Sequence, residues 1–187
     1  DSETTPDGIG GVRIELLGSL IAIDLVTLTG SDLFDTTGLV GTPVDSVRVD
    51  ADGTNNQIQS AGTTTLQSGG SAPAGADIFV NGRILTTGGG DIVVNALDRI
   101  ELSANLTAGN KIDLQDAVLL TGGVTLTAGA GGIDFDATLN GAFDLVLDAT
   151  GATTVTGAVG TTPVGDGTGA AITINSVGAT EFVSTVA

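Results

Sequence analysis

Carboxylate and carboxamide side chains carry most of the chemical potential of this sequence. There are 22 Asp and Glu residues against 5 Lys and Arg, and there is no His and no Cys. A nucleophilic triad that needs His, and a zinc site built from His or Cys, are therefore excluded. Phosphate-binding glycine motifs are not met either, because Gly88–Gly90 precedes a strand pattern and no Gly-Lys-Ser/Thr follows.

The stretch DADGTNN at residues 50–56 is a candidate cation site. Carboxylate and amide oxygens around a turn at Gly53 are ligands that a hard cation such as Ca²⁺ prefers. The sequence predicts a calcium site formed by Asp50, Asp52, Asn55 and Asn56. The stretch lacks the distant Glu and the flanking helices of an EF-hand, and an ordinary Asp-Gly turn is the alternative. A second candidate loop with a single carboxylate is Gly165-Asp166-Gly167.

A second group of acids follows the pattern of neighbouring strands. Asp134 and Asp136 are predicted to share one strand face, with Asp113 and Gln115 one coil before them. Such a ladder could bind calcium, or divide acid and base roles in a polysaccharide lyase or glycosidase. Lys111 borders the ladder as a candidate lyase base, but the aromatic residues that stack on sugars make up only 3% of the chain. We interpret the acids as a solvated outer face, and we expect no catalytic residues.

The elements that must position these side chains are visible as an internal repeat. Residues 106–117 read LTAGNKIDLQDA, and residues 126–141 read LTAGAGGIDFDATLNG. Apolar and polar residues alternate within each copy, which is the period of a half-buried β-strand. The copies lie about 20 residues apart, and repeats of this size are typical of solenoids. Recurrent Gly, Thr and Asn, with β-branched residues at the apolar positions, argue against helices.

Aligning three copies predicts which residues stack on successive coils. The apolar columns are Ile92, Ile112 and Ile133; Val94, Leu114 and Phe135; and Leu106, Leu126 and Leu147. The polar columns are Asp113 and Asp134, preceded by Val93, and then Asn95, Gln115 and Asp136. A single coil cannot bury its apolar residues, so each coil must pack on neighbours about 4.8 Å away. The sequence therefore predicts an all-β parallel β-helix or β-solenoid with coils of about 20 residues.

Glycine and asparagine mark the predicted corners of the coils. They occur as Asn81-Gly82, Gly88-Gly89-Gly90, Gly109-Asn110, Gly122-Gly123, Gly131-Gly132 and Asn140-Gly141. Both residues tolerate the positive φ that we expect at a sharp corner. Stretches rich in Gly, Thr, Ser and Pro are expected to form loops or longer, looser coils, and these are residues 1–11, 31–46, 54–77 and 160–169.

An approximate longer repeat predicts one continuous solenoid over residues 1–187. The tetrapeptide RIEL occurs at residues 13–16 and again at 99–102, and GLVGTPV at 38–44 resembles GAVGTTPV at 157–164. The second match has a wider offset than the first, so we expect a further coil inserted in the second half. We divide the chain into an N-terminal extension (1–11), a first long repeat (12–98) and a second long repeat (99–187).

The acidic balance limits the partners that the chain can bind. A formal net charge of −17 at pH 7 repels nucleic acid and anionic membranes, and it suits divalent cations or basic partners. The most apolar run, Leu16–Leu28, is too short to span a membrane and contains Asp24. We therefore expect no nucleic-acid partner and no membrane insertion. Residue 1 is Asp rather than Met, so we expect a processed chain or a piece of a longer protein.

The run LTAGAGGIDFDATLNGAFDLVLDATGATTVTGAVGTTPV at residues 126–164 resembles the repeat regions of filamentous-haemagglutinin-like adhesins, which are very large bacterial surface proteins. The resemblance extends over roughly residues 83–164 and, more weakly, over 12–60. It implies a right-handed parallel β-helix, export through the cell envelope, and an adhesive or matrix role. The family's secretion domain, with its Asn-Pro-Asn segments, is not present in this sequence, so the resemblance is to the repeat shaft. It supplies no catalytic residue.

Taken together, these patterns predict an extracellular, cell-surface structural protein of a bacterium. We expect a β-helical filament, surface-layer or adhesin shaft that assembles head to tail with neighbouring repeats or with another copy. No polar cap is evident, and an uncapped coil exposes ladder donors and acceptors that invite further strands. The alternative is an adhesin module whose loops at 54–77 or 160–169 bind a glycan or protein.

Two weaker alternatives are a β-helical carbohydrate-active enzyme and an ice-binding face. An ice-binding face needs Thr residues stacked on successive coils. The candidates Thr27 and Thr29, Thr63–Thr65, and Thr125 and Thr127 are not expected to stack, and Asp148 falls opposite Thr127.

Overall fold

The computed structural model describes residues 14–16, 20–22, 26–31, 47–49, 57–69 and 77–186. The regular elements of this part are all β-strands, and they form three parallel sheets that we name A, B and C. Sheet A contains β1 (Ile14–Leu16), β4 (Val47–Val49), β7 (Ile78–Val80), β10 (Arg99–Leu102), β13 (Ala117–Leu120) and β16 (Leu139–Asn140). Sheet B contains β2 (Leu20–Ala22), β5 (Gln57–Ser60), β8 (Arg83–Thr86), β11 (Leu106–Thr107), β14 (Val124–Ala128), β17 (Leu145–Ala149) and β19 (Ile172–Ile174). Sheet C contains β3 (Val26–Ser31), β6 (Thr64–Gly69), β9 (Ile92–Asn95), β12 (Lys111–Leu114), β15 (Gly132–Phe135), β18 (Thr153–Val155) and β20 (Thr180–Phe182).

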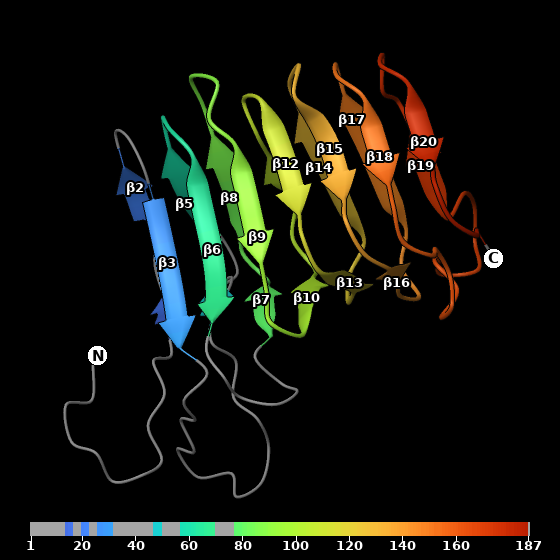
Figure 1. The fold of residues 1–187 in the computed structure, drawn as a ribbon, viewed down its shortest axis with the longest axis horizontal. Helices are drawn as coiled ribbons and strands as arrows, with labels where there is room; N and C mark the ends of the chain where they lie inside the picture. Colours follow the sequence, from blue (N-terminus) through green and yellow to red (C-terminus); the bar gives the residue numbers. More distant parts are fainter. Residues whose placement is uncertain are drawn as a thin grey trace, which may run out of the picture.

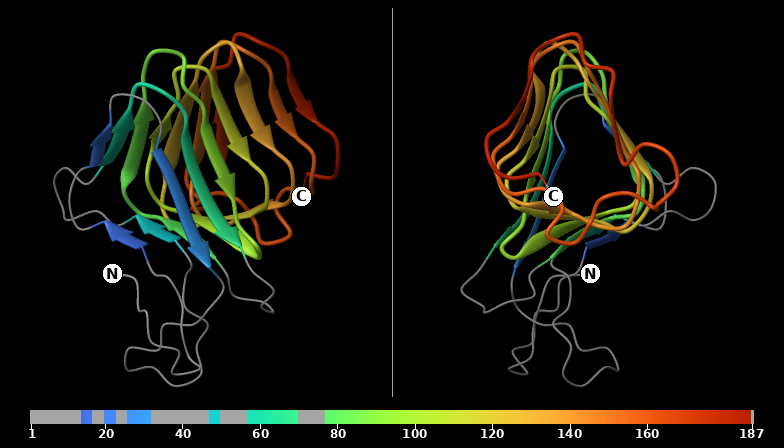
Figure 2. Two further views of the ribbon diagram at one scale, coloured as in Figure 1. Left: turned by 60° about the vertical axis from the view of Figure 1, so that its left-hand side comes forward. Right: turned by 90° about the vertical axis from the view of Figure 1, so that its right-hand side faces the viewer.

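From β1 to β18 successive strands enter sheets A, B and C in turn, and the bridge at Val159 takes the sheet A position before β19 and β20, so the chain winds as a stack of coils (Figure 1). The coil of β1, β2 and β3 lies at one end of the stack, and β19 and β20 lie at the other. A view along the stack shows a three-sided outline with one sheet on each side (Figure 2, right). The predicted all-β parallel solenoid is confirmed.

The register between coils agrees with the alignment of the sequence repeats. Ile112 pairs with Ile92 on one side and with Ile133 on the other, and Leu114 pairs with Val94 and Phe135. The sheet B column of Leu106, Leu126 and Leu147 and the outer pair Asp113 and Asp134 are also as predicted. Register follows from the sequence here because a slip of one residue would turn every apolar side chain outward.

The interior is built from the inward positions of the three sheets. Ile84, Ile100, Ile112, Leu126 and other aliphatic side chains at these positions have no exposed surface. Among the described side chains, Phe135 is the largest that is fully buried, and the other buried apolar residues are Ile, Leu, Val and Ala. A stack of aliphatic columns needs little width, which explains how a chain with five Phe and no Trp or Tyr forms a continuous core.

The glycine corners differ from the prediction in their physical cause. In the described residues, positive φ is confined to glycines and includes Gly88, Gly89, Gly132 and Gly141, but no asparagine. Gly109 has no positive φ, yet a Cβ on it would lie 2.7 Å from the backbone nitrogen of Gly89 on the preceding coil. Several corners therefore need glycine because the coils approach closely, rather than because the chain turns left-handed.

The less regular stretches divide into two kinds. β5 and β6 lie within residues 54–77, so part of this stretch belongs to a coil and to the ladders of sheets B and C. Residues 160–169 contain no strand and connect Val159, which bridges Leu139 and Val186, to β19. The two RIEL segments overlap β1 and β10, which both lie in sheet A. The boundary between the two long repeats stays a prediction.

Candidate functional site

The predicted calcium ligands Asp50, Asp52, Asn55 and Asn56 lie outside the described residues, between β4 and β5. The calcium site therefore stays a prediction. Among the side chains that the structure describes, no group of three or more His, Cys, Asp and Glu residues could hold a metal ion.

The second candidate loop, around Asp166, uses its carboxylate internally. Asp166 Oδ1 accepts hydrogen bonds from the Thr168 hydroxyl at 2.7 Å and from the Thr168 backbone N–H at 2.8 Å. These two bonds lower the pKa of the Asp166 carboxyl. The backbone N–H of Asp166 donates in turn to Asp144 Oδ1. The carboxylate thus closes a turn within the corner that connects Val159 to β19.

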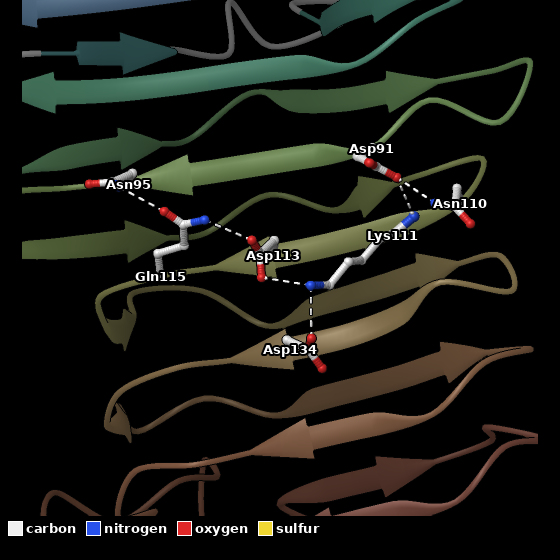
Figure 3. A network of polar contacts seen from close by, with 7 residues as sticks. All are labelled: Asp91, Asn95, Asn110, Lys111, Asp113, Gln115 and Asp134. Carbon is white, nitrogen blue, oxygen red and sulfur yellow. Dashed lines mark hydrogen bonds and ion pairs between the residues drawn. The ribbon is translucent and has the colours of Figure 1, made fainter.

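The strongest cluster of charged side chains lies on the outer face of sheet C (Figure 3). Lys111 Nζ lies 2.8 Å from Asp134 Oδ2 on the next coil and 3.1 Å from Asp113 Oδ1 on its own strand. The Gln115 amide donates to Asp113 Oδ2 and accepts from Asn95 on the preceding coil, both at 2.7 Å. We call Asn95, Lys111, Asp113, Gln115 and Asp134 the sheet C network. It connects three consecutive coils, on β9, β12 and β15.

The geometry of Lys111 makes it a poor general base. Its hydrogen bond to Asp134, together with the charges of both carboxylates, raises the pKa of Lys111 to about 12 against the opposing effect of burial. A lyase base must release its proton near neutral pH, so its pKa should lie near the operating pH. Lys111 instead stays a cation that neutralises the two acids, which is a structural use of the charge.

For two further acids beside this network, Asp136 and Asp116, the surroundings disfavour the charged carboxylate. Burial raises the pKa of the Asp136 carboxyl, and the charges of Asp113 and Asp134 raise it further. Burial also raises the pKa of Asp116, although a backbone hydrogen bond from Ala96 opposes the shift. Charge repulsion on this face is therefore only partly relieved, because Lys111 bonds to Asp113 and Asp134 but not to Asp136.

A set of side-chain acceptors that the sequence analysis missed connects the coils near their corners. In each case an oxygen on the earlier coil accepts a backbone N–H from the later coil, as Asn105 does from Thr125 at 2.8 Å and Asn140 does from Thr162 at 2.9 Å. The other pairs in the described part, each given as the accepting side chain and then the donating N–H, are Thr63 and Asp91, Ser68 and Leu97, Thr86 and Gly109, Asp91 and Lys111, and Asp144 and Asp166. In all of these bonds the acceptor lies on the earlier coil and the N–H donor on the later coil, so each bond ties a corner to the coil before it.

The Thr pattern is more regular than the sequence suggested. Thr27 pairs with Thr65, and Thr107 pairs with Thr127, so the expectation that Thr residues do not stack on successive coils is wrong for these pairs. Each stack stops after two coils, because Val93 follows Thr65 and Asp148 follows Thr127. No Thr face extends along the described coils, which weighs against ice binding.

The last described coil differs from the others in its exposed apolar surface. Four of the six large apolar side chains that are exposed in the described residues belong to it: Ile174, Val177, Val183 and Val186. Ile174 is 40% exposed and Val186 is 57% exposed, although both occupy columns whose members on earlier coils, such as Leu147 and Leu139, are fully buried. These exposed residues lie where the described ladders of the three sheets end.

Comparison of the chain with protein-family models, with curated proteins and with solved structures finds no match. The likeness to filamentous-haemagglutinin-like repeats accordingly stays an inference from the sequence pattern. The described part of the chain has no helix of the length and hydropathy needed to cross a membrane.

Proposed function

We propose that this chain is a segment of an extracellular structural shaft on a bacterial surface, as a filament, surface-layer or adhesin stalk. The observation that supports it most directly is the continuity of parallel sheets B and C through every described coil, with sheet A running from β1 to β16 and continuing through the bridges of Val159 and Val186. In such a stack each coil is stabilised mainly by its neighbours, so adding coils lengthens the rod without changing its cross-section. That is the property a shaft needs.

The chemistry of the outer face is consistent with this role. Two contacts of the sheet C network, Lys111 to Asp134 and Asn95 to Gln115, join neighbouring coils, and Lys111 is held protonated beside two acids. A second ion-pair group on sheet A follows the same rule, because Arg99 bonds Glu101 on its own strand and Asp77 beside β7. Both charged clusters therefore contain ion pairs that connect neighbouring coils, Arg99 with Asp77 and Lys111 with Asp134. This use of charge favours a scaffold over an enzyme.

Immunogold electron microscopy of the source cells, with an antibody against this chain, tests the proposal. Labelling of surface filaments or of a surface layer on intact cells is the expected result. Labelling that appears only after the cells are permeabilised would contradict it. Substituting Asp134→Asn and Asp136→Asn should leave the surface labelling unchanged, and loss of an enzyme activity with the fold intact would instead favour the carbohydrate-active alternative.

The loop at residues 160–169 favours a second function, that of a glycan- or protein-binding adhesin module. This loop is the longest excursion from the coils between β7 and β20, and it is anchored by Asn140, whose Oδ1 accepts from Thr161 and Thr162. Phe143, which is 39% exposed, lies at the same corner and accepts the N–H of Gly165 through its carbonyl oxygen. An anchored loop beside an exposed aromatic ring offers a fixed apolar surface to a ligand.

Replacing residues 161–168 with a short Gly-Ser linker separates the two functions. If the chain is a binding module, this change abolishes adhesion to immobilised glycans or host cells while the circular dichroism spectrum is unchanged. If the chain is a shaft, adhesion is unaffected. Phe143→Ala is a milder variant of the same test, because it removes the exposed ring without altering the loop backbone.

A further inference from the structure

Two Asn-Gly dipeptides occur in the chain, and both lie at the corner that connects sheet A to sheet B. Asn81-Gly82 separates β7 from β8, and Asn140-Gly141 lies at the end of β16, before β17. Asn-Gly is the dipeptide most prone to spontaneous deamidation, because glycine has no side chain to hinder attack of its backbone nitrogen on the asparagine amide. The same modification is therefore open to two sites, and their surroundings differ.

Deamidation of this kind is a cyclisation that needs no enzyme. The backbone nitrogen of the glycine loses its proton and forms a bond to Cγ of the asparagine, the bond from Cγ to the amide nitrogen breaks, and ammonia leaves with the proton. Water then adds to the succinimide ring and opens it to aspartate or to isoaspartate, in which the main chain runs through the side-chain carbons. Either product replaces a neutral amide with a carboxylate, which is charged at neutral pH.

The two sites share several features. Both glycines are buried, and both asparagines are half-buried. The Ser103 hydroxyl donates to Asn81 Oδ1 at 2.8 Å. The Thr161 hydroxyl and the Thr162 N–H donate to Asn140 Oδ1 at 2.7 Å and 2.9 Å. Donors on a carbonyl oxygen stabilise the negative charge that develops there during attack, so both asparagines are suitable electrophiles. The sites differ instead in how the glycine nitrogen is held.

At the first site a strand holds the glycine nitrogen. The Gly82 N–H donates to the Val49 carbonyl oxygen at 2.8 Å, and the Asn81 N–H donates to the same oxygen at 2.7 Å. Val49 is the last residue of β4, which pairs with β7 in sheet A. A hydrogen-bonded amide gives up its proton only when that part of the structure opens, and here two coils of a sheet would have to separate. We therefore expect the Gly82 nitrogen to be a poor nucleophile in the folded chain.

At the second site a loop holds the glycine nitrogen. The Gly141 N–H lies 3.4 Å from the Thr162 carbonyl oxygen, which is the longest backbone hydrogen bond outside the strands in the described residues. Thr162 is exposed and belongs to the loop at residues 160–169, which contains no strand. The Thr162 N–H also donates to Asn140, so one outward movement of this loop frees both groups that react. An exposed loop opens at a lower free energy than a paired strand does.

We propose that Asn140 is a site of spontaneous deamidation, that opening of the loop at residues 160–169 gives access to it, and that sheet A protects Asn81 from the same reaction. The inference goes beyond the proposed shaft and does not depend on it, because the reaction needs only water. It adds a covalent modification that accumulates as the protein ages, at the residue that anchors the loop.

The two products have different effects on the loop. Aspartate at position 140 keeps a side-chain oxygen in place, and it accepts hydrogen bonds from Thr161 and Thr162 with the added strength of a charged acceptor. Isoaspartate adds a carbon to the main chain and moves the carboxylate, so these two bonds are lost. The extra carbon also disturbs the pairing of Asn140 with Leu119 in the ladder of β13 and β16. Isoaspartate should therefore release the loop, whereas aspartate should not.

Mass spectrometry of the aged chain tests the site, with Asn81 as the internal control. The chain is incubated at mildly alkaline pH, either folded or unfolded in guanidinium chloride. Trypsin then separates the two dipeptides by cleaving after Arg83 and Lys111. In the unfolded chain both sites should gain mass at similar rates, whereas in the folded chain Asn140 should react at least about tenfold faster than Asn81. Equal rates at the two sites of the folded chain, including no reaction at either, would overturn the proposal.

Variants test the access through the loop. Replacing residues 161–168 with the Gly-Ser linker should accelerate the reaction at Asn140 and leave Asn81 unchanged, because the Gly141 nitrogen loses its partner. A slower reaction at Asn140 would overturn the role of loop opening. Asn140→Gln should abolish the gain of mass at that site, with Asn81→Gln as the matched control. Isomerisation of Asp166, which also precedes a glycine, leaves the mass unchanged and does not interfere.

Hydrogen exchange tests the release of the loop. The Thr162 N–H should exchange as slowly in Asn140→Asp as in the fresh wild type, because a side-chain oxygen still accepts its hydrogen bond. In the isoaspartate fraction of the aged wild type the same N–H should exchange faster. Equal exchange in this fraction and in Asn140→Asp would overturn the release.

Discussion

Lys111 is the cation in the sheet C network, so its titration should be visible in the stability of the fold. The pKa of Lys111 is raised from 10.5 to about 12 in the folded chain, mainly by the hydrogen bond to Asp134. A folded-state pKa above the unfolded value means that the stabilisation is complete below pH 10.5 and is lost as the pH rises through about 12. Lys111 is partly exposed, so after discounting for solvent the contribution is about 1 kcal/mol.

Lys111→Gln should therefore lower the free energy of unfolding by about 1 kcal/mol below pH 10.5 and have little effect near pH 12. Lys111→Arg should retain most of the stability and keep it to higher pH, because guanidinium does not titrate there. Urea unfolding at both pH values measures the difference. The chain has no Tyr and no Cys, so few other groups titrate in this window. An equal loss for Gln at both pH values would contradict the ion-pair interpretation.

The charged form of Asp136 should destabilise the fold, whereas the charged form of Lys111 stabilises it. Burial and the charges of Asp113 and Asp134 raise its pKa, so the folded chain binds a proton more readily than the unfolded chain. Its contribution to stability therefore falls as the pH rises from 3.8 through the raised pKa. Asp136→Asn should raise the free energy of unfolding at neutral pH by about 0.5 kcal/mol and flatten this dependence.

Asp148→Asn is the matched control for Asp136→Asn, because Asp148 is exposed on β17 opposite the uncharged Thr127. Removing its charge should change the free energy of unfolding by less than about 0.5 kcal/mol. If the two variants behave alike across the acid range, the local repulsion around Asp136 is not what sets its effect.

Corners are the elements in which the coils approach most closely, and Gly132 at the start of β15 shows why. Its φ is +78°, and a Cβ there would collide with the carbonyl oxygen of Ala152 on the next coil. Gly167 has a similar φ of +86°, but a Cβ there would meet nothing within 4 Å. Substitutions at Gly132 and Gly167 therefore distinguish the energetic cost of a left-handed backbone from the cost of a clash between coils.

Gly132→Ala should cost about 3 kcal/mol of unfolding free energy, because it adds a steric clash to the cost of a left-handed backbone. Gly167→Ala should cost about 1 kcal/mol, which is the backbone cost alone. Urea or thermal unfolding of the two variants provides the comparison. Similar losses would mean that the coils can separate at Gly132 without penalty.

The strands and their register could be predicted, whereas the corners could not. Ile92, Ile112 and Ile133 repeat within a period-two pattern, and burial of one face leaves a single register. The acceptor bonds of Asn105 and Asn140 have no such signal, because they depend on how each corner places a side chain against the next coil. β5 and β6 were obscured for a similar reason, since polar residues such as Ser60 and Thr64 occupy inward positions there and bond one another.

For the molecule as a whole, the net charge of −17 should make salt a general stabiliser. Raising NaCl screens the repulsion between acids and should increase the melting temperature by a few degrees, to about the same extent as Mg²⁺ at equal ionic strength.

The predicted calcium site at residues 50–56 leads to a separate prediction, which is an effect specific to Ca²⁺. Ca²⁺ should raise the melting temperature further than Mg²⁺ does, and Asp50→Asn/Asp52→Asn should remove only that excess. Asp148→Asn serves as the control, and equal effects of the two cations on the wild type would reject the site.

Parallel stacking also determines how the chain responds to force. The hydrogen bonds of all three sheets lie along the long axis of the stack, between one coil and the next (Figure 1). Tension applied to the two ends of the polypeptide therefore unzips the outermost coil before the next one bears load. A coil of about 20 residues, such as the one from Leu139 to Val159, releases about 70 Å of extended chain when it peels away, and the longer coils at the two ends release more. The chain should extend in a series of steps, and a tether of this kind absorbs a sudden pull by lengthening before it breaks.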